Sequence, residues 1–396
     1  MQLSQLFNFL LLVSPLALCR AVTSSDEAYS TYNTGCKNPL VRREWRLLPD
    51  HEKKEYIDAV KCLQALPALT SNNVPGAVTR FDDFQGIHIR QAEFIHAVGS
   101  FQHWHRYMIW IYEKALREEC GYRGSQPYWD WTLDSASDSA FINSPLWNPT
   151  TGFGGNGPYV NGTFNPFFSV PERTGGGCVQ DGPFSNYTIH MGPFNTTAKI
   201  PQCLRRDFAP FISTLRLTEE AVRLHHCEDT FGRYDVKVQT GITERGLRLS
   251  DAGFHAAGHL SVGGEAGQMS DIYASPGDPV FYLHHASVDH EWWKWQNVDR
   301  EARLKDATGP ILRFGIPLGN RTGGENITLD FMIGLSELAP MVPLRRVMDT
   351  EGDLLCYTYA REKAVYDYAT GKWVAEEVSE SEYEDDLEEF CENSDN

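Results

Sequence analysis

The chain has 396 residues, 41% of them hydrophobic, and a formal net charge of -18. This length allows one large core or two ordinary domains, and the composition is that of a globular protein. The strongly negative charge argues against binding to nucleic acid, whose phosphates attract basic surfaces.

The first residues have the character of a secretory signal. An apolar run from Leu6 to Leu18 ends at Cys19 after small residues, which predicts cleavage there and a signal peptide over 1–19. The run is too short for a membrane anchor, and no other segment has the pattern of a bilayer span. We therefore expect a secreted protein with no membrane contact.

Cysteines and glycosylation motifs support export. Cleavage would leave eight cysteines, and eight can pair in 105 ways, so the sequence leaves the pairing open. They are Cys36, Cys62, Cys120, Cys178, Cys203, Cys227, Cys356 and Cys391. Candidate N-glycosylation sites are Asn161, Asn186, Asn195, Asn320 and Asn326.

Apolar spacing predicts helices over 40–66, 81–119, 205–225 and 278–296. The stretch 145–200 is rich in Gly, Pro, Asn and Thr and is predicted to be a long loop region. Short alternating runs between 326 and 360 predict strands. The end of the chain, 376–396, holds 11 carboxylate side chains and no Lys or Arg, so we expect it to be disordered. This pattern indicates one domain over 36–360 and an acidic tail over 361–396.

Two of the predicted helices place a histidine on an apolar face, one turn after a phenylalanine. In the first, the face consists of Phe101, His105, Met108, Tyr112 and Ala115. In the second, the same offsets give Phe281, His285, Val288, Trp292 and Trp295. The neighbouring histidines, His103 and His284, point away from these faces.

Further histidines upstream complete a triad in each half of the chain. His255 and His259 are four residues apart, a spacing that lets two imidazoles bind one metal ion. His88 and His96 are eight residues apart, about two helical turns. A lone buried histidine is usually a hydrogen-bonded core residue, but two parallel triads indicate two metal sites. Imidazole ligands suit copper or zinc, and three protein ligands leave positions open for catalysis or gas binding.

These motifs resemble the type-3 copper proteins, which are the tyrosinases, catechol oxidases and hemocyanins. The resemblance is closest to short secreted fungal tyrosinase-like proteins and runs from about Cys36 to Tyr359. Matching stretches include FDDFQGIHI, FQHWHRY, QPYWDW, GHLSVGG, SPGDPVFYLHH and LCYTYA. The implied fold is mainly α: an antiparallel four-helix bundle around a dinuclear metal site, with long loops and a few short strands.

The resemblance also implies roles for individual residues. One copper ion would be bound by His88, His96 and His105, and the other by His255, His259 and His285. In the family pattern DPxFxxHH the second histidine is the ligand, which excludes His284. Phe101 and Phe281 would pack against ligand imidazoles, and Asp289 would orient a ligand through a hydrogen bond.

Family members use O2 and two copper ions to oxidise phenols. Tyrosinases with strong monophenolase activity often have Asn directly after the ligand that corresponds to His255, where this chain has Ala256. Alanine cannot hold a water by a hydrogen bond, so we expect oxidation of o-diphenols to o-quinones with weak or no monophenolase activity. Glu244 is interpreted as a surface residue rather than a water-holding glutamate. Ala256 and Leu260 are expected to line the substrate entrance, and Phe94 excludes the cysteine thioether found in some members.

The expected partners are O2 and a small phenolic substrate, in fungal pigment or secondary-metabolite biosynthesis; the oligomeric state stays open. One alternative is a zinc enzyme on the same fold that rearranges a secondary metabolite without redox chemistry. Another is an O2-binding, hemocyanin-like protein. The chain ends soon after the LCYTYA stretch, so no folded plug domain is expected, and Cys227 in the HHC stretch is expected to form a disulfide.

Overall fold

The structure is a computed structural model that describes residues 36–162, 168–240, 242–243, 246–247, 249–312 and 325–394. The predicted signal peptide, Glu244 and the sequon at Asn320 lie outside these residues. The fold is mainly helical with a few short strands, as the sequence predicts. No helix among the described residues is long and apolar enough to cross a membrane.

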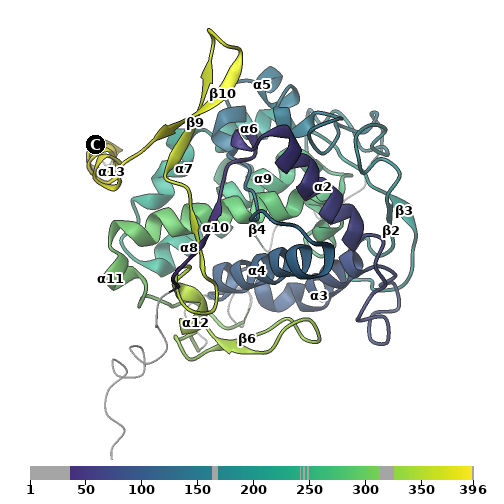
Figure 1. The fold of residues 1–396 in the computed structure, drawn as a ribbon, viewed down its shortest axis with the longest axis horizontal. Coiled ribbons are helices and arrows are strands. Elements are labelled where there is room, and N and C mark those ends of the chain that lie inside the picture. Colours follow the sequence, from purple (N-terminus) through teal and green to yellow (C-terminus); the bar gives the residue numbers. More distant parts are fainter. Residues whose placement is uncertain are drawn as a thin grey trace, which may run out of the picture.

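The helices and strands follow in chain order (Figure 1). The helices are α2 (Asp50–Leu63), α3 (Arg80–Ile95), α4 (Phe101–Cys120), α5 (Asp138–Ile142), α6 (Pro210–Arg216), α7 (Glu219–His226), α8 (Phe231–Gln239), α9 (Phe254–Gly263), α10 (Val280–Val298), α11 (Arg300–Arg303), α12 (Arg345–Met348) and α13 (Glu380–Ser394). The strands are β1 (Leu40–Arg42), β2 (Thr188–Ile189), β3 (Gln202–Cys203), β4 (Ile242–Thr243), β5 (Gly246–Leu247), β6 (Met332–Ile333), β7 (Val342–Pro343), β8 (Tyr357–Tyr359), β9 (Glu362–Asp367) and β10 (Lys372–Glu377).

Four helices form the centre of the molecule. The helix α10 packs against both α4 and α9, and α3 packs against α4 (Figure 1). The core between them is aromatic: Tyr112 of α4 and Tyr282 of α10 stack with ring centroids 3.6 Å apart. Apolar side chains of these helices pack inward and form the core around the centre of the bundle.

The predicted helices are present but differ in extent, and the one predicted over 205–225 forms α6 and α7. The helical region predicted over 81–119 consists of α3 and α4, because the chain leaves helical geometry at His96 and Ala97 has a φ of 56°. The start of the 40–66 prediction is the strand β1, and the helix α2 begins only at Asp50. Between 326 and 360 the chain forms three short strands, as expected, together with the short helix α12.

Local sequence explains where the two halves of the first helical region begin and end. Thr79 and Asp82 form a reciprocal capping box at the start of α3, which satisfies backbone N–H groups that the helix leaves free. The helix α4 ends at Gly121, whose φ of 69° is left-handed and suits glycine.

Four disulfides join distant parts of the chain. They link Cys36 to Cys356, Cys62 to Cys120, Cys178 to Cys203 and Cys227 to Cys391. The first of them lies beside the parallel pairing of β1 with β8, so the two ends of the main domain are tied together. Cys227 is therefore half of a disulfide, as expected from the sequence.

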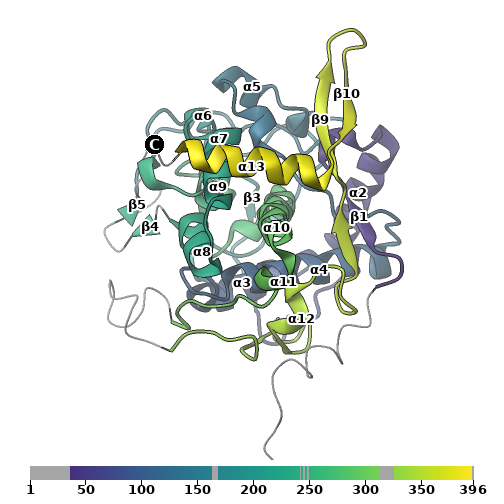
Figure 2. The ribbon, with the colours of Figure 1, turned by 90° about the vertical axis from the view of Figure 1, so that its left-hand side faces the viewer.

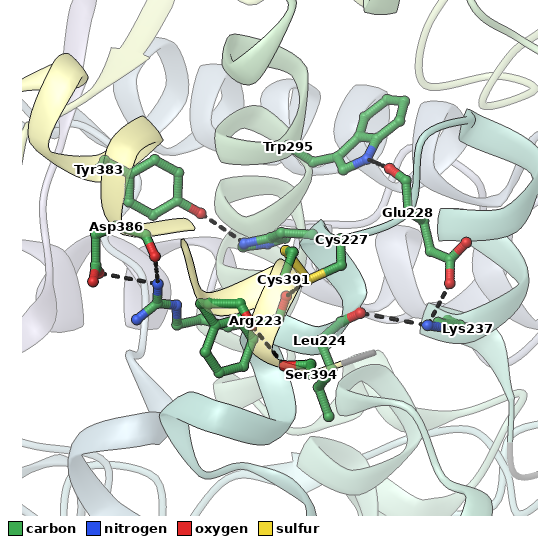
Figure 3. Close-up of a disulfide and its surroundings, with 12 residues drawn as sticks. Arg223, Leu224, Cys227, Glu228, Lys237, Trp295, Tyr383, Asp386, Cys391 and Ser394 are labelled. Carbon is green, nitrogen blue, oxygen red and sulfur yellow. Dashed lines mark hydrogen bonds and ion pairs between the residues drawn. A yellow bond between two sulfur atoms is a disulfide. The ribbon is translucent and has the colours of Figure 1, made fainter. Parts of the chain in front are cut away.

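The expectation of a disordered acidic tail is wrong. Residues 362–377 form the antiparallel hairpin of β9 and β10, and α13 lies across α7 (Figure 2). Figure 3 shows the bond between Cys227 and Cys391 and, beside it, Arg223 of α7 paired with Asp386 of α13 at 3.0 Å. The hydroxyl of Tyr383 lies 2.7 Å from Nδ1 of His226. Composition predicted disorder because it could not reveal the covalent and polar contacts that order this segment.

Candidate metal centre

The first triad comes from α3 and α4. His88 lies on α3, His96 is the residue directly after its last turn, and His105 lies on α4 one turn after Phe101. The centroid of the His96 ring is 5.0 Å from that of His88 and 5.1 Å from that of His105. All three residues are buried.

The second triad comes from α9 and α10. His255 and His259 lie one turn apart on α9, and His285 lies in the first half of α10. The ring of His285 is 5.2 Å from that of His255 and 5.3 Å from that of His259. The Nε2 atoms of His259 and His285 are 3.2 Å apart.

The two triads face each other in the middle of the four helices. The rings of His105 and His285 stack at 4.4 Å with an interplanar angle of 12°, and His96 lies 6.2 Å from His255. The structure thus brings together all six histidines that the sequence predicts as ligands. Within each triad, nitrogen atoms that could bind a metal lie within 4.8 Å of one another.

Backbone carbonyl groups orient the rings. Nδ1 contacts a carbonyl oxygen in His88 (Tyr273, 2.6 Å), His96 (Ala92, 3.0 Å), His105 (Phe101, 2.9 Å) and His259 (Met269, 2.7 Å). A carbonyl only accepts, so each Nδ1 donates its proton, and Nε2 keeps a lone pair. This arrangement is usual for histidines that bind metals.

The rings are also kept neutral. Burial, with a smaller contribution from the neighbouring imidazoles, holds the pKa of His88, His105, His255 and His285 well below the usual value. Burial lowers the pKa of His259 to about 4. Lone pairs on these rings are therefore free of protons at neutral pH.

A family model for the common central domain of tyrosinase matches residues 78–298, more than half of the chain, and this range contains all six histidines. The chain belongs to the tyrosinase family. It is 36% identical to a tyrosinase-like protein of Diaporthe leptostromiformis over 332 residues. This alignment covers 82% of this chain and 78% of that protein. It is thus a tyrosinase-like oxidoreductase.

Two further comparisons extend the match along the chain. The N-acetyl-6-hydroxytryptophan oxidase of Emericella nidulans is 33% identical over 379 residues, 88% of this chain and 99% of that protein. A solved structure of a mutant polyphenol oxidase from Thermothelomyces thermophila has a TM-score of 0.70 and 31% identity. That match covers 84% of this chain and 92% of the other.

The tyrosinase family implies a dinuclear copper centre, and the histidines fit it. Nε2 of His88, His105 and His255 is buried without a hydrogen-bond partner among the described residues. A buried acceptor without a partner costs free energy, and a metal ion would satisfy it. Neutral imidazoles without thiolate are ligands that copper accepts.

Two aromatic side chains frame this tyrosinase-like centre. The ring of Phe101 lies 4.6 Å from His105 and 4.5 Å from His255, so it contacts one ring of each triad. The ring of Phe281 lies 4.2 Å from His285 and 5.3 Å from His88, so it also contacts one ring of each triad. Both phenylalanines are completely buried and limit access of water to the rings.

Asp289 does not have the role that the resemblance implied. Its carboxylate binds Arg42 and Arg106 and accepts hydrogen bonds from Tyr357 (2.5 Å) and Tyr359 (2.6 Å). It therefore joins α10 to α4, β1 and β8, and it orients no imidazole through these bonds. The reason is that Arg42 and Arg106 lie against this turn of α10, and their charges and the two tyrosine hydroxyls occupy the carboxylate oxygens.

The two residues expected at the substrate entrance lie on α9. Ala256 and Leu260 are each 4% exposed, so neither forms an open surface. Phe94, by contrast, is 62% exposed, two residues before His96. Between Ala256 and Leu260 on the same helix, His259 is only partly buried, so α9 leaves the second triad partly accessible at this residue.

The histidines outside the triads have other partners. His103 is completely buried, with Nε2 3.2 Å from the sulfur of Met348. In the HHC stretch, His225 packs against Phe254 at 4.7 Å, and His226 contacts Glu291 at 3.1 Å. None of these is among the triad histidines.

Sequence reasoning missed the groups that hold the histidine rings in place. The carbonyl of Met269 lies in the short 3-10 helix Gln268–Ser270 and that of Tyr273 in the turn after it, and nothing in such a sequence marks a carbonyl as an acceptor. Trp131 was also missed, although it lies in the QPYWDW stretch. Its indole N–H donates to His284, a contact across 153 positions of sequence.

Proposed function

We propose that the two histidine triads each hold one copper ion, and that the chain uses O2 to oxidise small phenolic substrates, o-diphenols to o-quinones. The proposal rests on the convergence of six histidine side chains in a chain of the tyrosinase family. The ligands would be His88, His96 and His105 for one ion and His255, His259 and His285 for the other. Copper held there supplies electron transfer between the phenol and O2.

The chain's own groups would prepare this chemistry. The backbone carbonyls that accept from Nδ1 fix the tautomer of four imidazoles, so Nε2 is presented without a proton. Phe101 and Phe281 hold the rings and keep the centre dry. Because the rings are fixed before a metal arrives, little reorganisation is needed on binding.

A preference for o-diphenols is supported by Ala256. This residue follows His255 and carries no polar side-chain atom, so it cannot position a water to deprotonate a monophenol. The expected effect of Ala256→Asn is a higher ratio of monophenol to o-diphenol oxidation. An unchanged ratio in a variant that binds copper normally would contradict this role for Ala256.

A place in fungal pigment or secondary-metabolite biosynthesis is supported by the relatives. One of them is named N-acetyl-6-hydroxytryptophan oxidase, and its named substrate is a hydroxylated aromatic compound. A panel of catechols, o-aminophenols, hydroxyindoles and phenolic polyketides, scored by O2 consumption, would rank substrate classes for this chain.

The decisive experiment measures copper and zinc separately in the purified protein and then O2 consumption with catechol. We expect two copper ions per chain and catechol oxidation; His105→Ala and His285→Ala should each lose one copper ion and catechol oxidation. His103→Leu is the matched control, because His103 is equally buried but lies outside the triads. Bound zinc without O2 consumption would instead indicate the non-redox enzyme. Reversible O2 binding without turnover would indicate a hemocyanin-like carrier.

Secretion is proposed on the signal-like residues 1–19 and on the four disulfides, which form in oxidising compartments. The sequon residues Asn161, Asn186, Asn195 and Asn326 are all exposed and accessible to glycosylation. Mass spectrometry of the secreted protein, before and after enzymatic deglycosylation, would locate the mature N-terminus and the modified sites.

A further inference from the structure

His284 lies in the centre of the bundle beside the second triad. It is 0% exposed, and its ring is 4.5 Å from that of His259 and 5.2 Å from that of His285. By proximity alone it could be a fourth ligand in this cluster. Its hydrogen bonds exclude this role.

Both ring nitrogens of His284 are used by other groups. The indole N–H of Trp131 donates to Nδ1 at 3.1 Å, and an indole nitrogen can only donate. Nδ1 is therefore an acceptor, and the single ring proton lies on Nε2. That proton is donated to the backbone carbonyl oxygen of His255 at 3.1 Å. No lone pair of His284 remains for a metal ion.

The ring of His284 fills a space left by a glycine of α9. A Cβ atom on Gly258 would lie 2.3 Å from Cε1 of His284, which is far inside van der Waals contact. Gly258 lies between His255 and His259 in the same helix. The imidazole of α10 thus rests directly on the backbone of α9, within the turn that carries two ligands of the second triad.

Trp131 contacts α9 as well as His284. It lies in the short 3-10 helix Trp131–Asp134 and is 1% exposed. Its ring stacks on Phe254 with centroids 5.4 Å apart, and Phe254 is the first residue of α9, directly before His255. One side chain therefore fixes the start of α9 and, through a hydrogen bond, the ring that separates α9 from α10.

We propose that Trp131 and His284 are positioning residues for the second metal site, a role that rests on the function proposed above. Together they set the distance and rotation of α9 relative to α10, so that His255, His259 and His285 converge on one ion. The partner groups of His284 are an indole donor and a carbonyl acceptor, so only a neutral imidazole of one tautomer satisfies both.

The first half of the chain provides a control. His103 also lies near a triad histidine, two residues before His105 on α4, whereas His284 directly precedes His285, and both are 0% exposed. Its ring packs on Phe231 (5.1 Å) and Trp292 (4.8 Å), and Nε2 contacts the sulfur of Met348. None of these three side chains is a triad histidine or directly adjacent to one in the sequence, so His103 serves as a control for the burial of a histidine.

The test compares copper retention at each site in full-length protein. Wild type, His284→Leu, Trp131→Phe and His103→Leu are loaded with copper and dialysed against graded chelator, and bound copper per chain is measured. The same proteins in a His88→Ala background report the second site alone, and in a His259→Ala background the first site alone. Melting temperatures of the metal-free proteins report general damage.

We expect His284→Leu to weaken copper binding at the second site about 10- to 100-fold and to leave the first site unchanged. Trp131→Phe should weaken the same site by a smaller factor. His103→Leu should lower the melting temperature and leave both sites at wild-type affinity. If copper affinity fell equally at both sites and the melting temperature fell with it, the cause would be a general packing defect, and the positioning role would be overturned. Unchanged copper binding at both sites would also overturn it.

Two milder variants keep the test decisive if His284→Leu does not fold. His284→Asn retains an acceptor near the Nδ1 position for Trp131, and His284→Gln retains a donor near the Nε2 position for the His255 carbonyl. Each variant should recover part of the second-site affinity that is lost in His284→Leu. If His284→Leu does not fold, each variant should still bind copper more weakly than wild type at the second site and equally well at the first. A wild-type protein that binds no copper at all would contradict the proposed function; two tightly bound copper ions in every His284 and Trp131 variant would contradict this inference alone.

Discussion

Replacing Asp289 with asparagine tests how the bundle is held together around the metal centre. Asp289 is 3% exposed, and its carboxylate is shared by Arg42, Arg106 and two tyrosine hydroxyls. Asparagine has nearly the same shape and can still accept from a tyrosine. The change therefore removes the negative charge and leaves the packing in place.

The structure sets the size of the expected effect. Arg42 keeps a second carboxylate, Glu113, at 2.6 Å. Arg106 keeps Gln296 at 3.0 Å and backbone carbonyls, but among the described residues it has no other ion-pair partner. Leaving one buried charge without its counter-ion typically costs about 3–5 kcal/mol, so we expect Asp289→Asn to lower the free energy of unfolding by about 3–5 kcal/mol.

The effect should depend on pH in one direction. Burial alone would raise the pKa of Asp289, but Arg106 and Arg42, with the tyrosine hydroxyls, hold it below the usual value. A carboxyl whose pKa is lowered by folding stabilises the protein above its unfolded pKa of about 3.9 and loses that contribution as the pH falls through the folded pKa. The difference between wild type and Asp289→Asn should be constant from about pH 5 to 8 and shrink at lower pH.

Urea unfolding of the metal-free proteins at several pH values measures both effects. Asp58→Asn is a surface control, because Asp58 pairs with Lys54 in an exposed place and its loss should cost under about 1 kcal/mol. A loss below about 1 kcal/mol for Asp289→Asn, or a difference that does not shrink in acid, would refute the reasoning that this carboxylate balances the buried arginines.

Three further predictions concern other parts of the fold. Replacing Cys227 and Cys391 together by serine opens a bridge between residues 164 positions apart and should lower the free energy of unfolding by about 2–5 kcal/mol, and an unchanged urea midpoint would contradict this. Gly258→Ala places a methyl group against His284 and should cost about 1–3 kcal/mol, measured by thermal unfolding; a variant as stable as wild type would mean that the two helices can move apart freely. Stripping metal with chelator should lower the melting temperature, and copper should restore it, with about 4 kcal/mol expected at 1,000 times the dissociation constant. A melting temperature that is unchanged by chelator and by added copper would contradict the binding of a metal to the folded state.

Much of the metal centre is predictable because its signals are local. The pairs Phe101 with His105 and Phe281 with His285 recur at one-turn spacing, and helical periodicity alone places each pair on an inward face. The same argument separates His105 from His103. The helices around these residues lie where apolar spacing predicts them, within a few residues at their ends.

Predictions that used composition or single spacing were less successful. The acidic tail has the composition of a disordered segment, yet α13 is bound to α7 by a disulfide and an ion pair. Asp289 follows His285 by one turn, yet it faces Arg42 and Arg106. In both cases the partner comes from a segment more than 150 residues away, and no periodic pattern connects the two.

The sequence by itself determined the helical periodicity and the inward positions of His105 and His285, because these depend on spacing within a few turns of one helix. The two histidine triads that it predicts lie together in the structure. Only the tertiary structure decided the disulfide pairs, the partners of Asp289 and the contact of Trp131 with His284. Such contacts form between residues that are far apart in the chain. Their geometry depends on how whole helices pack against each other. The order of residues along one helix carries no information about that packing.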